Sequence, residues 1–495
     1  MVFDILVVGG GINGCGIARD AAGRGLSVLL VEAQDLASAT SSASTKLIHG
    51  GLRYLEHYEF RLVREALAER ELLLSQAPHI IWPLRFVLPH DPAIRPAWLV
   101  RLGLFFYDHL ARRQRLPGSG QIRRAKHPFG APLQDWVDRA FVYSDCWVDD
   151  ARLVSLVALD ARERGAEIRL RTRFVSAQRA GDRWVATLAC TDRGVQRVEA
   201  RALVNAAGPW VSDVLGTALS IEPASRIRLV KGSHIVTRRL YDGEQAYMFQ
   251  NPDGRIIFVI PYEDAFTLIG TADEPFHGDP RTAAITPDEV QYLVESAGRF
   301  LRAPVRQEDI VHSFSGVRPL YDDRSSDASH ITRDYVLELN TDGAPVLSKF
   351  GGKITTFRRL AEQALKDLAP IFPGLPAAWT HKTILPGGDI PGEDIAAFAR
   401  PLPFPRARDR ATPRPLLRHA CARLSRLRDA GGRSRPRFRL RLYTSRTRLS
   451  ARGRKRRERR RRALASVQAR LAFECRGLSC NRDGVRPRRR YANDG

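Results

Sequence analysis

The first 32 residues alternate between apolar runs and a glycine-rich loop in an order that few folds accept. Residues 3–8 and 27–32 predict two strands, and residues 17–25 predict a helix between them that stops at a glycine. Gly9, Gly11 and Gly14 follow the first strand, where such a pattern gives a tight turn and lets the backbone approach a pyrophosphate. Glu32 ends the second strand and is placed to accept hydrogen bonds from ribose hydroxyls. This order predicts a dinucleotide-binding α/β domain.

Three later stretches extend the predicted cofactor site. Residues 39–51 form a polar, glycine-bearing loop, residues 205–208 follow an apolar strand, and residues 351–356 open another helix with glycines and hydroxyls. Remote loops of this kind favour FAD, lying through the whole domain, over NAD. The predicted cofactor-binding residues are Gly9, Gly11, Gly14, Glu32, Ser41, Ser42, Lys46, Leu47, Gly50, Gly51, Ala207, Gly208, Gly351, Gly352, Lys353 and Thr355.

The middle of the chain has a different pattern. Residues 246–250, 255–262 and 266–271 are short runs rich in Ile, Phe and Val with turn residues between them, which predicts an antiparallel meander. We therefore expect a discontinuous FAD domain interrupted by a substrate domain. The predicted limits are 1–75, 143–225 and 331–370 for the FAD domain, 76–142 for a substrate- or membrane-facing insert, 226–330 for the substrate domain, 371–400 for a linker and 401–495 for a tail.

The net charge of +25 is confined to the tail. Residues 401–495 hold 31 of the 79 basic and 6 of the 54 acidic residues, so the first 400 residues hold 48 of each. A balanced body gives no reason to expect a nucleic-acid partner, which would rest on the tail alone. Six cysteines are few for this length, and Cys15, Cys146 and Cys190 in the body show no ligand or disulfide spacing, which indicates a reducing compartment and no metal site. We expect neither a signal peptide nor a spanning helix.

Six motifs, in order from residue 1 to about residue 400, resemble FAD-dependent glycerol-3-phosphate dehydrogenase of the respiratory, quinone-linked bacterial aerobic type. They are GGGING at 9–14, ATSSASTKLIHGGLRYL at 39–55, YSDCWVDDAR at 143–152, KGSH at 231–234, SGVRPL at 315–320 and FGGKITT at 350–356. The resemblance implies oxidation of sn-glycerol 3-phosphate to dihydroxyacetone phosphate, with electrons passing through FAD to ubiquinone or menaquinone. It also implies a glutathione-reductase-type FAD domain with a D-amino-acid-oxidase-like substrate domain. The implied location is peripheral, at the cytoplasmic face of the bacterial inner membrane, and the resemblance leaves a homodimer open.

A dianionic phosphate requires fixed positive charge, and Arg318 is the first candidate because a guanidinium donates two parallel hydrogen bonds to phosphate oxygens. The alternative is a structural ion pair of Arg318 with Asp322 or Asp323. By resemblance, Arg53 and Tyr54 form a second anchor. Thr271 is a candidate hydroxyl donor at the end of a meander strand, with an ordinary strand threonine as the alternative.

Hydride transfer from C2 of the substrate requires that the C2 hydroxyl lose its proton. His234 and His49 are the candidate bases, and we rank His234 first because strand alternation can aim it at the flavin. His49 would then orient the flavin ring, and an arginine or a water molecule is also open as the base. Lys353 is placed to neutralise charge on the reduced flavin or on the phosphate.

Residues 95–115 combine apolar aromatic residues, which we expect to be exposed, with arginines. This pattern is typical of an interfacial segment on anionic lipid. The alternative is a buried core helix with a basic end. A lipid-soluble quinone acceptor favours the interfacial interpretation.

The tail departs from the family, whose C-terminal region is a helical domain. Residues 384–400 still match, and then arginine- and proline-rich sequence begins. Our hypothesis is a reading-frame shift in a GC-rich gene, with a genuine basic tail as the alternative. For the body, the alternative function is another flavin oxidase of the D-amino-acid-oxidase superfamily, acting on an amine or a 2-hydroxy acid.

Overall fold

The computed structural model describes residues 2–222, 227–321 and 335–390. The predicted tail, 401–495, lies outside the described residues. Two sheets organise the described part. The first sheet runs in the order β16 (Tyr335–Asn340), β17 (Val346–Gly351), β10 (Gly194–Asn205), β1 (Val2–Val8), β2 (Val28–Val31) and β7 (Glu167–Arg169), and β9 (Arg183–Cys190) and β8 (Thr172–Ala180) extend it from β10.

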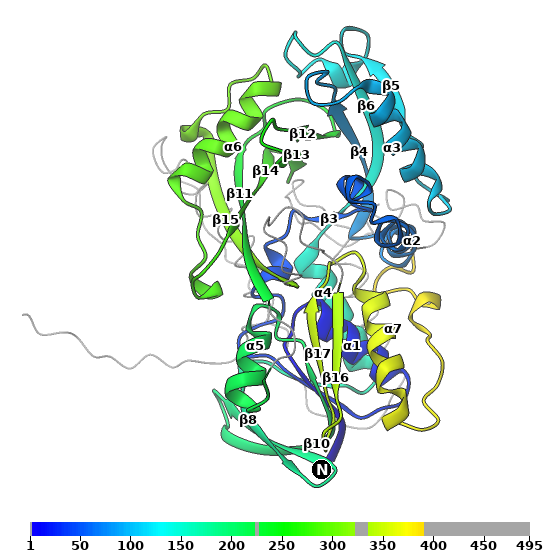
Figure 1. Ribbon diagram of the computed structural model, residues 1–495, viewed down its shortest axis with the longest axis vertical. Helices are drawn as coiled ribbons and strands as arrows, with labels where there is room; N and C mark the ends of the chain where they lie inside the picture. The colour runs from blue at the N-terminus through cyan, green and yellow to red at the C-terminus, as the bar shows by residue number, and fades with distance from the viewer. Residues whose placement is uncertain (1, 223–226, 322–334, 391–495) are drawn as a thin grey trace, which may run out of the picture. The chain divides into compact units, whose positions relative to one another are not determined.

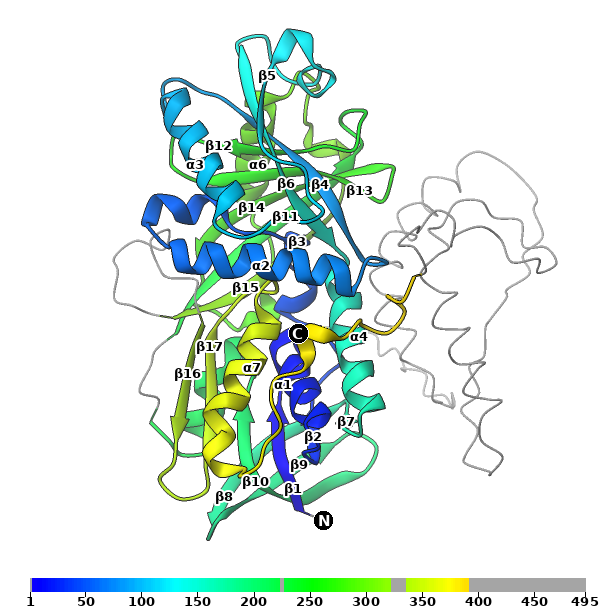
Figure 2. The same ribbon diagram turned by 90° about the vertical axis from the view of Figure 1, so that its right-hand side faces the viewer.

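The core of the first sheet is parallel, as the N-terminal pattern predicts. The end of β1 pairs with both neighbours, Val8 opposite Val31 of β2 and Val8 opposite Asn205 of β10. Helices α1 (Ile12–Gly23), α4 (Asp150–Glu163) and α7 (Phe357–Leu368) pack together on one face, and the hairpin β8–β9 and α5 (Val211–Asp213) cover the other (Figures 1 and 2). The α/β fold class is confirmed.

The first helix begins five residues earlier than the sequence predicts. Gly14 lies inside α1, and a Cβ atom there would stand 2.0 Å from the carbonyl oxygen of Gly9. A Cβ atom at Gly16 would stand 2.9 Å from the ring of Phe357 in α7. Both glycines permit close packing of a regular helix, and the prediction that the loop extends to Gly14 is wrong.

The second sheet contains the predicted meander. Its order is β15 (Ile310–Tyr321), β11 (Ile227–Arg238), β14 (Phe266–Pro275), β13 (Ile256–Tyr262), β12 (Ala246–Gln250), β4 (Ile81–Pro89), β6 (Arg139–Val148) and β3 (Leu47–Ile48), with β5 (Gly120–Arg123) beside β6. Helix α6 (Pro287–Phe300) packs Leu293, Ala297 and Phe300 on one face of this sheet. Helices α2 (Phe60–Gln76) and α3 (Ala97–His109) lie near β4 and β6 (Figure 2).

The predicted domain limits need one correction. Strands β4, β5 and β6 belong to the same sheet as the meander, and the limit between residues 142 and 143 falls inside β6. The reason is a long-range pairing, in which β12 pairs with β4 in parallel. Such a pairing leaves no local signal in either strand.

Residues 39–51 belong to one of the segments that connect the two sheets. The turn η1 (Thr40–Ser42) lies near the start of α1, and β3 pairs with β6 in the second sheet. The Thr40 hydroxyl donates to the carbonyl of Val317 in β15 at 2.6 Å. A Cβ atom at Gly316 would stand 2.8 Å from the carbonyl oxygen of Ala43, so this glycine lets the segment lie directly on β15.

Candidate active site

The glycine loop brings the backbone of β1, β10 and α1 into contact. Gly9 has φ +112°, and a Cβ atom there would stand 2.5 Å from the carbonyl oxygen of Ala206, at the end of β10. The N-cap of α1, Gly11, has no side-chain cap, and no acidic residue occupies the first turn. The helix N-terminus therefore presents backbone N–H groups and a partial positive charge, which suit a phosphate group.

Glu32 closes this loop from the next strand. Its carboxylate accepts hydrogen bonds from the N–H of Gly10 at 2.7 Å and of Gln34 at 2.8 Å. Burial raises the pKa of Glu32, and these two N–H groups oppose that rise. Ser41 lies across the loop, where its hydroxyl accepts from the N–H of Ile12 at 3.1 Å. The spacing of these groups fits a dinucleotide whose ribose meets the carboxylate.

The other predicted cofactor loops lie at the ends of strands. Gly208 (φ +59°) follows Ala207 at the end of β10, and Gly351 (φ +68°) and Gly352 (φ +89°) follow β17. Thr355 is buried and bonds to both backbone groups of His49, accepting from its N–H at 3.3 Å and donating to its carbonyl at 3.4 Å. The carboxyl ends of parallel strands are where ligands bind in folds of this type.

Lys46 is placed differently from its predicted role. Its ammonium group donates to Asp150 at 2.7 Å and to the carbonyl of Ser42 at 3.3 Å, and both charged side chains are buried. Leu47 is buried in β3, opposite Trp147. These contacts pin the loop to the start of α4, and the sequence carried no signal for Asp150 as a partner.

Lys353 and Tyr54 meet at the turn that follows β3. The Lys353 ammonium lies 3.7 Å from the centre of the Tyr54 ring. Gly51 (φ +78°) makes room for both, because a Cβ atom there would stand 2.3 Å from that ring and 3.4 Å from the Lys353 nitrogen. Arg53 is half-buried on the same turn, η2 (Leu52–His57). The turn thus gathers two of the predicted cations.

Arg318 forms an ion pair, but with a residue that the sequence analysis missed. One of its nitrogens donates to both carboxylate oxygens of Asp273, at 2.7 and 2.8 Å, and the two side chains are 24% and 25% exposed. Thr271 donates to the same carboxylate at 3.1 Å. The pair crosses over Gly232 of β11, where a Cβ atom would stand 3.1 Å from Arg318.

The predicted partners of Arg318, Asp322 and Asp323, lie outside the described residues. The position of Asp273 two residues after Thr271, on the same strand face, was the available signal. The predicted strand ended at residue 271 and so left Asp273 outside it, whereas β14 continues to Pro275.

His234 lies on the strand face that carries Gly232, but it is fully buried. Its Nε2 is 3.0 Å from the Thr45 hydroxyl, and its ring stacks on Phe314 at 4.8 Å. Burial lowers the pKa of His234 to about 3, with nearby Arg318 acting in the same direction. The imidazole is therefore neutral near pH 7.

His49 is half-buried between β3 and the Gly50–Gly51 turn. Its ring meets Phe258 edge-on at 6.4 Å, and Phe258 is paired with Gly270, next to Thr271. His49 therefore lies beside β13, which pairs with β14 near Thr271, as well as beside the predicted cofactor loops.

Lys231 and Ser233 lie near His234 in β11, but their side chains have different partners. Both side chains point to the opposite face, where Glu289 of α6 accepts from Lys231 at 2.9 Å and from Ser233 at 2.9 Å. Glu289 also completes the capping box of α6 with Thr286. This pairing fixes the strand from behind and leaves Gly232 and His234 on the site face.

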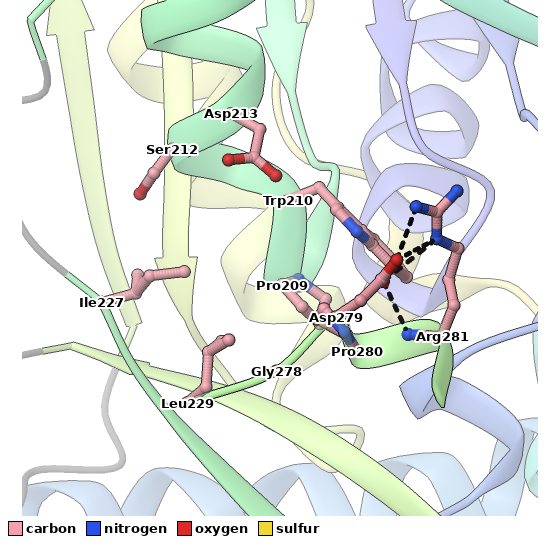
Figure 3. Close-up of a pocket in the computed structure, with 10 residues that line it drawn as sticks. All are labelled: Pro209, Trp210, Ser212, Asp213, Ile227, Leu229, Gly278, Asp279, Pro280 and Arg281. Carbon is pink, nitrogen blue, oxygen red and sulfur yellow. Dashed lines mark hydrogen bonds and ion pairs between the residues drawn. The ribbon is translucent and has the colours of Figure 1, made fainter. Parts of the chain in front are cut away.

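A separate surface cavity of about 560 Å³ lies between the start of α5 and the loop after β14 (Figure 3). Its charged pair, Asp279 and Arg281, is bonded to itself at 2.9 and 3.0 Å. None of the predicted site residues lines it, so we do not place the site there. In the described part of the chain no group of three or more His, Cys, Asp or Glu residues could hold a metal ion.

Comparison with known proteins identifies the family. The profile described as FAD dependent oxidoreductase matches residues 4–358. The chain is 54% identical over 401 residues to D-erythritol 1-phosphate dehydrogenase of Brucella abortus, covering 81% of this chain and 80% of that protein. It is 53% identical over 404 residues to aerobic glycerol-3-phosphate dehydrogenase of Escherichia coli, covering 80% of each.

A solved structure with bound cofactor is also similar. Glycerol-3-phosphate dehydrogenase from Bacillus halodurans, complexed with FAD, superposes with a TM-score of 0.64 at 27% identity, over 81% of this chain and 72% of that one. The predicted family resemblance and FAD as the cofactor are thereby confirmed.

The burial of His234 predicts an acid-sensitive contribution to stability. The unfolded chain protonates this histidine below about pH 6.5, whereas the folded protein leaves it neutral down to about pH 3. Stability should therefore fall as the pH drops through that window, by up to about 1.4 kcal/mol per pH unit from this group. Urea unfolding of the wild type and of His234→Gln at pH 7 and at pH 5 measures this. Equal pH slopes for the two proteins would contradict it.

Proposed function

The chain belongs to the FAD-dependent oxidoreductase family, and on that basis we propose that it oxidises sn-glycerol 3-phosphate to dihydroxyacetone phosphate. The observation that carries the proposal is the 53% identity with the aerobic dehydrogenase of Escherichia coli over 80% of each chain. We also propose that a membrane quinone, ubiquinone or menaquinone, takes the electrons.

The residues present fit FAD. The N-terminus of α1 would hold the pyrophosphate, Glu32 the ribose, and the turns at Gly50–Gly51 and Gly351–Gly352 the flavin end. When bound, FAD accepts the hydride that leaves C2 of the substrate.

We assign the phosphate of the substrate to Arg53 and Lys353 on the turn after β3. Lys353 lies over the Tyr54 ring at 3.7 Å, which places its ammonium group on this turn. Arg318 of β15 would contact the substrate from the second sheet, and its ion pair with Asp273 would orient its guanidinium group. Thr271 is bonded to the same carboxylate, so it would orient Asp273 rather than contact the phosphate itself.

We assign the base to His49. Proton removal needs a group that substrate can reach and that is able to hold a proton, and His49 is half-buried beside Phe258 whereas His234 is fully buried. His234 instead supports the loop through Thr45. His49 would take the proton of the C2 hydroxyl, with its backbone fixed by Thr355.

A second substrate has comparable support. The relative in Brucella abortus, at 54% identity, is a D-erythritol 1-phosphate dehydrogenase, so sequence identity does not separate a three-carbon from a four-carbon polyol phosphate. Both substrates join a phosphate to a secondary alcohol. Neither relative acts, by its name, on an amine or a 2-hydroxy acid.

We further propose that α3 rests on the membrane surface at the cytoplasmic face of the inner membrane. Its outward face carries Trp98, Leu99, Leu102, Phe105 and Phe106, with Trp98 67% and Phe105 52% exposed. Exposed Arg101, Arg112 and Arg115 lie on or just after the helix. Apolar aromatics beside arginines suit anionic lipid headgroups. Within residues 2–222, 227–321 and 335–390, no helix is both long and apolar enough to span a bilayer.

The substrate assignment is tested by the visible spectrum of the purified, FAD-loaded protein under anaerobic conditions. Adding sn-glycerol 3-phosphate should bleach the flavin band, because hydride transfer reduces the flavin. D-Erythritol 1-phosphate, glycine and lactate are added to separate samples. Bleaching by erythritol 1-phosphate alone would identify the second candidate, and bleaching by glycine or lactate alone would overturn the proposal.

Replacing His49 by Asn should lower kcat by about 100-fold or more, because proton removal loses its base. Flavin content, measured by absorbance, should stay near the wild-type value. His277→Asn, on an exposed loop, is the matched control and should behave as wild type. If His234→Gln lowers kcat more than His49→Asn does, with flavin retained in both, the assignment of the base is wrong.

The membrane proposal predicts that Trp98→Ser combined with Phe105→Ser weakens sedimentation with phosphatidylglycerol vesicles by about tenfold or more, since two apolar side chains no longer enter the interface. Val195→Ser is the control, because Val195 is 73% exposed at a hairpin of the first sheet. If the wild-type protein does not bind vesicles but forms a dimer, and the double variant is a monomer, this face is a dimer contact instead.

A further inference from the structure

Helix α3 has a second face, which points into the protein. Leu104 and Tyr107 are buried there, while Phe105 and Phe106 beside them are exposed. A helix is stiff over so short a distance, so a displacement of the outer face also displaces Tyr107.

The Tyr107 hydroxyl is bonded to the turn that follows β3. It accepts a hydrogen bond from the backbone N–H of Gly50 at 2.8 Å and donates to the carboxylate of Asp145 at 2.8 and 2.9 Å. The same N–H also donates to Asp145 at the longer distance of 3.4 Å. Arg70 of α2 holds that carboxylate at 2.7 Å and also donates to the carbonyl of Ser144 at 2.7 Å. All these side chains are buried.

The protonation state of this network is constant near neutral pH. Burial and the neighbouring Asp145 carboxylate raise the pKa of Tyr107 well above its usual value, so the phenol keeps its proton. With its proton committed to Asp145, the phenol oxygen is left as the acceptor for Gly50. A hydrogen bond between buried groups is costly to lose, because water cannot replace it.

Gly50 is also closely packed against its neighbours. A Cβ atom at Gly50 would stand 2.5 Å from Leu67 and 2.8 Å from the Tyr107 ring. The next residue, Gly51, adjoins Tyr54 and Lys353. Close-packed interiors transmit small displacements, so a shift of α3 is passed to the turn rather than absorbed in a void.

We propose that Tyr107 is a positioning residue that couples contact of α3 with a lipid surface to the flavin-binding turn at Gly50–Gly51. The inference rests on the proposed function in two respects, the place of the flavin end and the lipid contact of α3. Lipid contact would then alter the surroundings of the flavin through one backbone hydrogen bond. If Tyr107 were only structural, it would anchor α3, but lipid binding would not change the spectrum of the flavin.

The test combines vesicle sedimentation with the visible circular dichroism of the bound flavin, using FAD-loaded protein and phosphatidylglycerol vesicles. Wild-type protein should bind vesicles and change its flavin signal on binding. Tyr107→Phe should bind vesicles equally and show no change. Tyr143→Phe is the matched control, because the ring of this buried tyrosine lies 5.7 Å from the Tyr107 ring and its hydroxyl donates to the sulfur of Met248. It should respond as wild type does.

Three outcomes would overturn the coupling. A Tyr107→Phe variant that responds to vesicles as the wild type does shows that the hydrogen bond transmits nothing. Wild-type protein that binds vesicles without any change in the flavin signal rejects the coupling and leaves the membrane proposal standing. Wild-type protein that fails to bind vesicles rejects both. Bleaching of the flavin by substrate is measured in the same samples, so failure of the enzyme assignment is recognised separately.

A measurement on the wild type covers the case in which Tyr107→Phe does not fold. Hydrogen exchange of the peptide that contains Gly50 is followed by mass spectrometry with and without vesicles. The coupling predicts a change of about tenfold in exchange of this buried N–H, which corresponds to strengthening or weakening one hydrogen bond. Unchanged exchange in vesicle-bound protein would overturn it.

Discussion

Backbone contact at the carboxyl end of β1 is the constraint on which the site depends. Gly9, Gly14 and Ala206 lie so close that a side chain at either glycine would meet a carbonyl oxygen at 2.0–2.5 Å. Because these backbones touch, α1 starts directly at the edge of the sheet, with its N–H groups facing outward. The cofactor loops that follow β10 and β17 open at the same edge.

The segment from residue 39 to residue 51 carries this arrangement to the second sheet. Ser41 bonds to the start of α1, Thr40 to β15 and Lys46 to Asp150 of α4. Gly50 bonds to Tyr107 of α3. One short segment therefore contacts the FAD domain, the substrate strands and the proposed membrane helix. The hydrogen bonds of this segment hold together parts of the site that are far apart in the sequence.

Charge is distributed in the site by pairing as much as by the choice of residue. Lys46 is neutralised by Asp150, Lys231 by Glu289, and Arg318 by Asp273. Lys353 is held instead by an aromatic ring. The proposed phosphate site lies at the turn after β3 because Arg53 and Lys353 come together there.

The sequence by itself determined the α/β fold, the dinucleotide loop, the meander strands and the family, because each depends on spacing within a short stretch of chain. It did not determine which partners the polar side chains take. Asp273, Asp150 and Tyr107 lie 45, 104 and 57 residues from the groups they bind, and no local pattern marks them. The burial that leaves His234 neutral is likewise a property of the packed sheets. Tertiary structure decided these points, since charge, protonation and hydrogen bonding depend on what surrounds a residue in space.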